Sequence, residues 1–145
     1  MSIQKTIQDQ LKDAMRARDA VKLETLRYIL SELKYSQIEK QRELTDEESI
    51  EVLAREVKKR RDAIDLFKNS GRDQLVAEET TKLAFITVLL PEQLSSAELE
   101  AVIDEVIQTI GKGNMGAIIK EVMARVKGKA EGKVVSSIVQ EKLKA

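Results

Sequence analysis

The sequence predicts an all-α protein, and three observations support this fold class. The 145 residues contain a single proline, Pro91. Apolar residues recur at spacings of three and four along most of the chain, which is the period of an amphipathic helix. Glycines and helix-capping residues separate these stretches, and strand-like alternation is rare. We therefore expect an N-terminal helical subdomain of about four helices, followed by a small C-terminal three-helix bundle.

The first three helices follow from periodicity and from capping residues. Apolar residues at helical spacing indicate a first helix over about 2–17. Asp19 is a candidate N-cap for the second helix, because its carboxylate can accept a hydrogen bond from a free backbone N–H. Thr45 and Glu48 have the spacing of a capping box and predict the start of the third helix.

Gly71 and Pro91 define the fourth helix and the boundary between two subdomains. Gly71 stands where a C-cap glycine ends the third helix, and a fourth apolar stripe follows it. Proline cannot continue a helix, so Pro91 ends this one. The predicted subdomains are 1–91 and 92–145. The second is small enough to have marginal stability by itself.

Three helices are expected after Pro91. Ser95 and Glu98 have capping-box spacing, and the apolar residues of 99–110 form the cleanest amphipathic pattern in the chain. Asn114 is a candidate cap for the next helix. A last short helix is predicted over about 134–144.

Charge is balanced overall and uneven locally. The chain has 25 Lys and Arg and 25 Asp and Glu, so global charge gives no argument for nucleic-acid binding. Residues 92–111 carry five acids and no base, whereas residues 112–145 carry eight bases and three acids. Only a local basic patch in the C-terminal part can therefore attract phosphates.

The composition excludes several kinds of site. The chain has no cysteine and no histidine, which excludes disulfides and thiolate metal sites and removes the commonest general base. No serine stands in a nucleophile elbow, and no glycine run fits a phosphate-binding loop. We expect no metal, no cofactor and no independent enzymatic activity. No apolar run reaches the ~20 residues that span a bilayer, and the first residues lack a signal peptide, so a cytoplasmic location without a membrane partner is expected.

The basic run 58–61 suggests one ion pair. Measured from Val57, Arg61 falls inside the apolar arc of its helix. A buried guanidinium needs a partner. Arg61 lies ten residues before Gly71 and Glu79 eight after it, so the two face each other in an antiparallel hairpin. We predict an Arg61–Glu79 ion pair, which is either structural or part of a polar pocket that Arg27 also faces.

Residues 126–133, VKGKAEGK, admit two interpretations. They can be a helix corner, in which lysines complement the helix dipole and Gly128 is a left-handed C-cap. They can also be a contact for a phosphate backbone, supported by further basic residues nearby. Stacking with bases is not expected, because none of the four aromatic residues lies in the C-terminal part. The basic residues of this hypothesis are Lys112, Lys120, Arg125, Lys127, Lys129 and Lys133.

Five stretches carry a resemblance to a known family. They are LRYILSELK, REVKKRRDAIDLF, GRDQLVAEE, LLPEQLS and MGAIIKEVMARVKGKAEGKVVSSIVQEKL, in order along almost the whole chain. Together they resemble the YqeY family, the free-standing relatives of the tail domain on the B subunit of the tRNA-dependent amidotransferase. The chain departs from the family pattern at Leu89, where a tyrosine is usual, and at Glu131, where an aspartate is usual.

The resemblance implies a function. In the amidotransferase the tail domain contributes to holding tRNA. The positions carried over to this chain are Met115, Gly116, Lys127, Gly128, Lys129 and Lys133. The leading hypothesis is a non-catalytic, tRNA-associated accessory module whose basic loop contacts the backbone of folded RNA, with no DNA partner. The alternative is an adaptor that docks on an amidotransferase or an aminoacyl-tRNA synthetase through the acidic helix 96–110. A third is carbon–nitrogen ligase activity with glutamine as amide donor, only as part of a complex.

Overall fold

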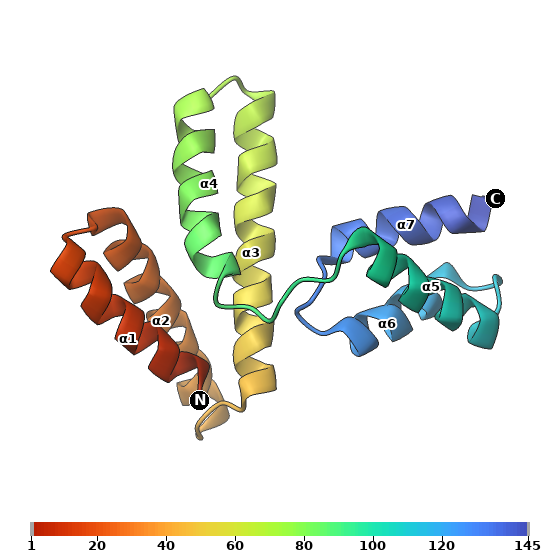
Figure 1. Ribbon diagram of the computed structural model, residues 1–145, viewed down its shortest axis with the longest axis horizontal. Coiled ribbons are helices and arrows are strands. Elements are labelled where there is room, and N and C mark those ends of the chain that lie inside the picture. Colours follow the sequence, from red (N-terminus) through yellow and green to blue (C-terminus); the bar gives the residue numbers. More distant parts are fainter. Residues whose placement is uncertain (1, 145) are drawn as a thin grey trace. The chain divides into compact units, whose positions relative to one another are not determined.

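The computed structural model describes residues 2–144, and these residues form seven α-helices and no strand (Figure 1). The all-α class is therefore confirmed. The chain divides between Leu90 and Pro91 into two compact units. The helices of the first unit are α1 (Ile3–Ala17), α2 (Ala20–Lys40), α3 (Asp46–Asn69) and α4 (Asp73–Thr87). Those of the second unit are α5 (Ser96–Ile110), α6 (Met115–Val126) and α7 (Gly132–Lys144).

Short-range capping sets most of the helix boundaries. Asp19 accepts a hydrogen bond from the backbone N–H of Lys22, at 3.1 Å, and begins α2. Thr45–Glu48 and Ser95–Glu98 both form complete capping boxes, as predicted. These caps satisfy backbone N–H groups that have no partner inside the helix.

The end of α4 and the start of α7 differ from the prediction. The helix α4 stops at Thr87, about one turn before Pro91. The N–H groups of Leu89 and Leu90 instead bond to the carbonyls of Ile86 and Thr87, which makes a tight terminal turn. Proline disfavours helical backbone in the residue before it, so the helix ends early. The last helix begins at Gly132, two residues earlier than predicted.

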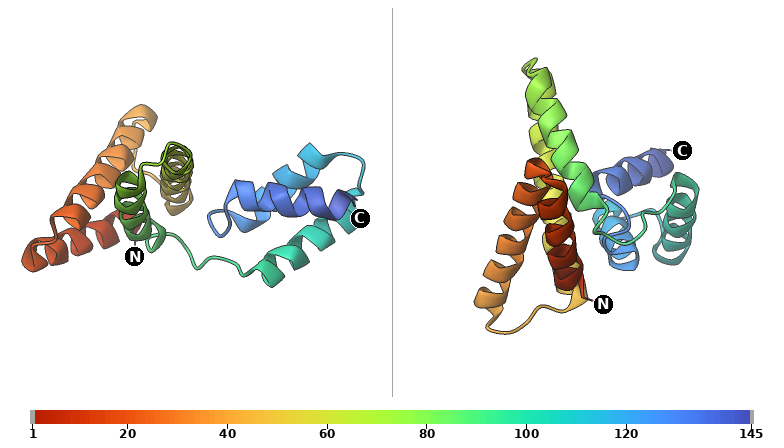
Figure 2. Two further views of the ribbon diagram at one scale, coloured as in Figure 1. Left: turned by 90° about the horizontal axis from the view of Figure 1, so that it is seen from above. Right: turned by 60° about the vertical axis from the view of Figure 1, so that its left-hand side comes forward.

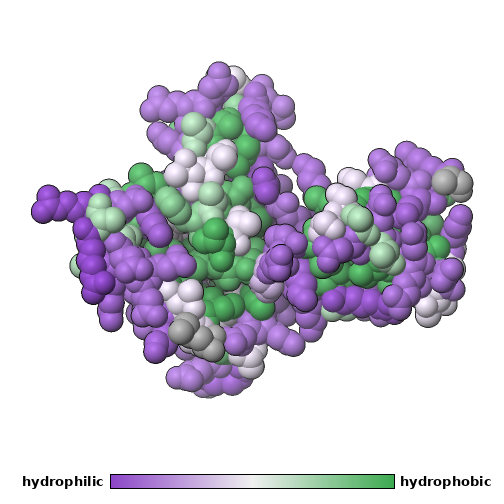
Figure 3. All heavy atoms as spheres, in the orientation of Figure 1, coloured by the Kyte–Doolittle hydropathy of each residue, from purple (hydrophilic) through white to green (hydrophobic). Residues whose placement is uncertain are grey.

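The first unit is built from two helical hairpins, α1–α2 and α3–α4. The α3–α4 hairpin extends well beyond the ends of α1 and α2 (Figures 1 and 2). In the space-filling view, hydrophobic residues gather over the middle of this unit, and mostly hydrophilic residues cover the end of the α3–α4 hairpin (Figure 3). The fully buried residues of its core come from all four helices: Ile7, Leu26, Ile29, Leu33, Leu53 and Ile86.

The second unit is a three-helix bundle with its own apolar core. The side chains that α5, α6 and α7 bury against one another are Leu99, Ile103, Val106, Ile118, Val122, Val126, Val135 and Val139. Because these side chains repeat at helical spacing on three helices, the unit closes around a single core. This core positions the turn between α6 and α7, where the basic residues gather.

Candidate nucleic-acid interface

The basic loop, residues 127–131, connects α6 to α7. Gly128 has a φ of 72°, the left-handed conformation that glycine adopts without steric cost. The N–H of Lys129 donates to the carbonyl of Val126 at 2.7 Å and closes the end of α6. The side chains of Lys127, Lys129 and, at the start of α7, Lys133 are exposed. The helix-corner geometry therefore coexists with an exposed basic surface.

The backbone of the basic loop is anchored by the segment 91–94. The side-chain amide of Gln93 donates to the carbonyls of Gly128, at 2.7 Å, and Pro91, at 2.9 Å. The N–H of Leu94 donates to the carbonyl of Lys129 at 2.8 Å. These bonds fix the loop through its carbonyls, so its lysine side chains extend from a defined backbone. Gln93 gave no signal in the sequence, because its partner Gly128 lies 35 residues away.

Arg125 is engaged by carboxylates of the same unit. Its guanidinium lies 3.2 Å from Glu121 and 3.4 Å from Glu105. Lys142 lies 2.8 Å from Asp104, and this hydrogen bond raises the pKa of Lys142. The acidic α5 is therefore neutralised in part by cations from α6 and α7. Arg125 contributes to packing between helices more than to an open basic surface.

The other candidates lie away from the basic loop. Lys112 precedes α6, and the loop follows it, so about 18 Å of helix separates them. Lys120 is exposed between the two ends of α6. Met115 packs against the core of the second unit. Gly116 lies in the first turn of α6 with room for a methyl group, because an added Cβ would lie 3.5 Å from the Asn114 oxygen. The nine candidates therefore do not form one continuous surface.

Arg60 forms an ion pair between α3 and α4, and the predicted placement of Arg61 in the apolar arc of α3 is wrong. Arg60 donates to Glu79 at 2.8 Å, with side chains 15% and 19% exposed. Arg61 is exposed. The buried face of α3 centres on Glu56, Arg60 and the positions one turn to either side. Val57, the reference for the prediction, lies at the edge of that face.

Aromatic and polar groups surround the Arg60–Glu79 pair. The Arg60 guanidinium lies 5.6 Å from the centre of the Tyr28 ring, which is within cation–π distance. Lys82 lies 3.8 Å from Glu79. One turn earlier, the buried Glu56 accepts a hydrogen bond from Lys59 at 3.2 Å and raises the pKa of Lys59. The cluster joins α2, α3 and α4.

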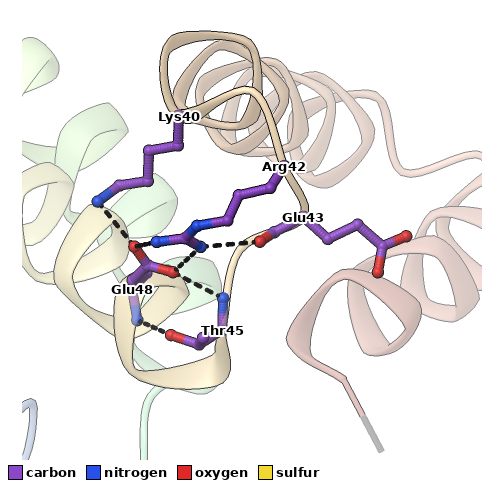
Figure 4. Close-up of polar contacts among 5 residues, drawn as sticks. All are labelled: Lys40, Arg42, Glu43, Thr45 and Glu48. Atoms are coloured by element: carbon purple, nitrogen blue, oxygen red, sulfur yellow. Dashed lines mark hydrogen bonds and ion pairs between the residues drawn. The ribbon is translucent and has the colours of Figure 1, made fainter.

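A second charged cluster fixes the turn between α2 and α3 (Figure 4). Arg42 donates two hydrogen bonds to Glu48, at 2.6 and 2.8 Å, and Lys40 lies 2.7 Å from the same carboxylate. Glu48 also accepts from the N–H of Thr45 at 3.0 Å. The guanidinium of Arg42, followed by Lys40 and Thr45, holds the pKa of Glu48 well below its usual range. The predicted capping box is thus part of a larger electrostatic cluster.

Neither a metal site nor a membrane helix is found in residues 2–144. No three acidic residues in this range approach closely enough to hold a metal ion. None of the seven helices is both long and apolar enough to cross a bilayer.

Comparison with known protein families shows which family the chain belongs to. The model of the Yqey-like protein family matches residues 4–143. The chain belongs to this family. The resemblance predicted from the sequence is confirmed.

Individual relatives of this Yqey-like protein include fungal and archaeal proteins. An uncharacterized protein of Schizosaccharomyces pombe is 30% identical over 66% of this chain and 77% of its own length. Altered inheritance of mitochondria protein 41 of Pyrenophora tritici-repentis is 28% identical over 93% of this chain and 77% of its own. One component of the glutamyl-tRNA(Gln) amidotransferase of Thermococcus gammatolerans is 42% identical over 34% of this chain. That match covers 9% of the archaeal protein.

The relatives correct the expected location. Several proteins that are 28–30% identical to this Yqey-like protein are named as mitochondrial. The expectation of a cytoplasmic location is therefore wrong, because it rested on composition and on the first residues alone. A family with mitochondrial members is not confined to the cytoplasm.

Proposed function

We propose that this Yqey-like protein is a tRNA-binding accessory module related to an amidotransferase. The basic loop contacts the phosphate backbone of folded RNA, and tRNA is the first candidate. The similarity to a segment of a glutamyl-tRNA(Gln) amidotransferase component supports both the accessory role and the choice of RNA. The chain supplies binding and no chemistry of its own.

The observation that carries this proposal is the anchored basic loop. Lys127, Lys129 and Lys133 are exposed within seven residues of one another. Gln93 and Leu94 donate hydrogen bonds to the carbonyls of Gly128 and Lys129 and so anchor the backbone of the loop. Phosphate contacts from exposed lysines give affinity without reading the base sequence.

Recognition by backbone and shape fits the distribution of aromatic residues. Tyr28, Tyr35, Phe67 and Phe85 all belong to the first unit. The surface of the second unit therefore offers no ring for an unstacked base. Folded RNA, whose phosphates follow a defined path, suits a rigid basic loop better than a flexible single strand.

The adaptor alternative has less support. It requires the acidic face of α5 to meet a basic partner. Asp104 and Glu105 already contact Lys142 and Arg125 within the unit. A basic partner that docks on α5 would have to displace these contacts. The displacement makes its binding free energy less favourable.

The test is a tRNA titration of the full chain at 50 and 200 mM salt. Three phosphate contacts predict a roughly fortyfold loss of affinity over this range. Changing Lys127, Lys129 and Lys133 to Gln should weaken binding at 50 mM and flatten its salt dependence. The matched control changes the exposed Lys5, Lys12 and Lys68 of the first unit to Gln, with the same change in charge.

Two outcomes would overturn the proposal. One is no binding of tRNA by the wild type at 50 mM salt. The other is an equal loss of affinity in the loop variant and in the control variant, because that result would reflect total charge and not the basic loop. Salt-insensitive capture of an amidotransferase by the wild type, without RNA, would instead favour the adaptor.

A further inference from the structure

The helix α2 carries apolar side chains on two opposite faces. Leu26, Ile29 and Leu33 are completely buried in the core of the first unit. On the other face, Tyr35 is 62% exposed and Ile38 is 74% exposed. Val21 is also exposed on this face, and Tyr28, which is 42% exposed, lies at its edge, with the Arg60 guanidinium 5.6 Å from its ring centre. A helix on the surface of a domain normally has a polar outer face, so a second apolar face indicates a partner.

The exposed residues of α2 have the spacing of a coiled-coil contact. Val21, Tyr28 and Tyr35 are seven residues apart, and a second series lies three residues after each of them. These two series correspond to the a and d positions of a heptad. We name this set the outer stripe; it comprises Val21, Glu24, Tyr28, Ser31, Tyr35 and Ile38.

Charges beside the outer stripe specify the partner. Arg27 and Lys34 follow one edge, at the g positions, and Glu32 and Glu39 follow the other, at the e positions. In a parallel pair of helices, a g residue faces the e residue five positions later on the partner. Arg27 would face Glu32 of a second copy, and Lys34 would face Glu39. An antiparallel pair would instead place like charges together.

We propose that two copies of this chain associate through their outer stripes, with the two α2 helices parallel and in register. The chain is complementary to itself in this arrangement, because both flanking pairs are of opposite charge. Glu24 opposes the association, since it would face its own copy at a d position. The association is therefore weak and depends on protein concentration. This inference is independent of RNA binding and concerns the first unit only.

The first test is sedimentation equilibrium of the full chain from about 5 to about 500 µM. The proposal predicts a reversible monomer–dimer equilibrium. Changing Tyr35 and Ile38 together to Lys should abolish the dimer, and Glu24→Leu should strengthen it. The control, Leu66→Lys, changes another exposed apolar residue, on α3, and should leave the equilibrium unchanged. A monomer at every concentration would overturn the proposal. The partner of the outer stripe would then be a different protein.

Charge reversal tests the parallel direction. Lys34→Glu should raise the dimer dissociation constant about tenfold, because two attractive pairs become repulsive. Glu39→Lys should do the same. The variant with both changes should recover the wild-type value. Lys34 and Glu39 provide a cleaner pair than Arg27 and Glu32, because Glu32 also lies near Lys59 of its own chain. Failure of the double variant to recover would overturn the proposed pairing.

A single cysteine tests the parallel arrangement directly. The chain has no cysteine of its own. Glu24→Cys should form a disulfide-linked dimer under mild oxidation, because a parallel pair places residue 24 beside its own copy. In an antiparallel pair residue 24 would face residue 35, so the two cysteines would be about 16 Å apart along the axis. The control is Leu66→Cys. Equal cross-linking of both variants would contradict the proposal.

Discussion

Replacing Arg60 by alanine should destabilise the first unit far more than replacing Arg61. Arg60 donates a 2.8 Å hydrogen bond to Glu79 and lies 5.6 Å from the centre of the Tyr28 ring. A charged hydrogen bond contributes about 1.5–3 kcal/mol, and a cation–π contact about 0.5–1 kcal/mol. Both partners of the ion pair keep some exposure, which reduces these values. We therefore expect Arg60→Ala to lower the free energy of unfolding by about 2 kcal/mol.

The assay is urea and thermal unfolding of the full chain, followed by circular dichroism at 222 nm. A loss of about 2 kcal/mol in a unit of this size corresponds to a fall of about 8–16 °C in Tm. Arg61 is exposed, and interactions at the surface contribute little, so Arg61→Ala should lower the free energy of unfolding by less than about 1 kcal/mol. An Arg61→Ala variant as unstable as Arg60→Ala, or more so, would refute the assignment of the buried cation to Arg60.

Three further predictions concern pH, glycine and the second core. The Arg42 guanidinium keeps the pKa of Glu48 below its ordinary value, so this carboxylate stabilises the fold fully above about pH 5 and progressively less at lower pH. The difference in urea midpoint between wild type and Glu48→Gln should therefore narrow from pH 7 to pH 3, and an equal difference at both pH values would contradict this cause. Gly71→Ala should cost about 1 kcal/mol of unfolding free energy because φ is 71°, whereas Gly116→Ala should be neutral or stabilising in the same urea titration; the reverse order would contradict the backbone geometry. Ile103→Ala should cost about 2–5 kcal/mol, enough to unfold the small second unit, and hydrogen exchange should show α5–α7 unprotected while α1–α4 stay protected. Uniform loss of protection along the chain would contradict separate cores.

The local features of the fold were predictable because their causes lie within a few residues. The caps at Asp19, Asn114 and the two capping boxes each depend on a side chain and an N–H group three positions away. The left-handed Gly71 follows from its position after a helix. Helix caps can be predicted from the sequence because they form between residues that are close along the chain.

The position of the buried cation was not predictable from apolar residues alone. The prediction measured the apolar arc of α3 from Val57 and placed Arg61 inside it. The contacts with α2 and α4 turn the helix so that Glu56 and Arg60 lie nearer the centre of its buried face. A hydrophobic pattern does not identify polar residues on a buried face, because such residues are buried only where a partner satisfies their polar groups.

The turn that carries the candidate interface was predictable from the sequence, whereas the contacts around it were not. The cluster of lysines and the glycine at 128 identified the turn between α6 and α7. The role of Arg125 required the knowledge that α5 lies beside α6, since Glu105 is its partner. The anchoring role of Gln93 could be predicted only from the fold, which brings Gly128 next to Gln93. Tertiary packing decided both.

The anchor between the segment 91–94 and the basic loop also creates a mechanical route through the chain. Gln93 and Leu94 follow directly on Pro91, and their hydrogen bonds end on the carbonyls of Gly128 and Lys129. A pull or twist applied to the chain at Pro91 therefore reaches the basic loop through these bonds as well as the apolar core, against which Leu94 packs.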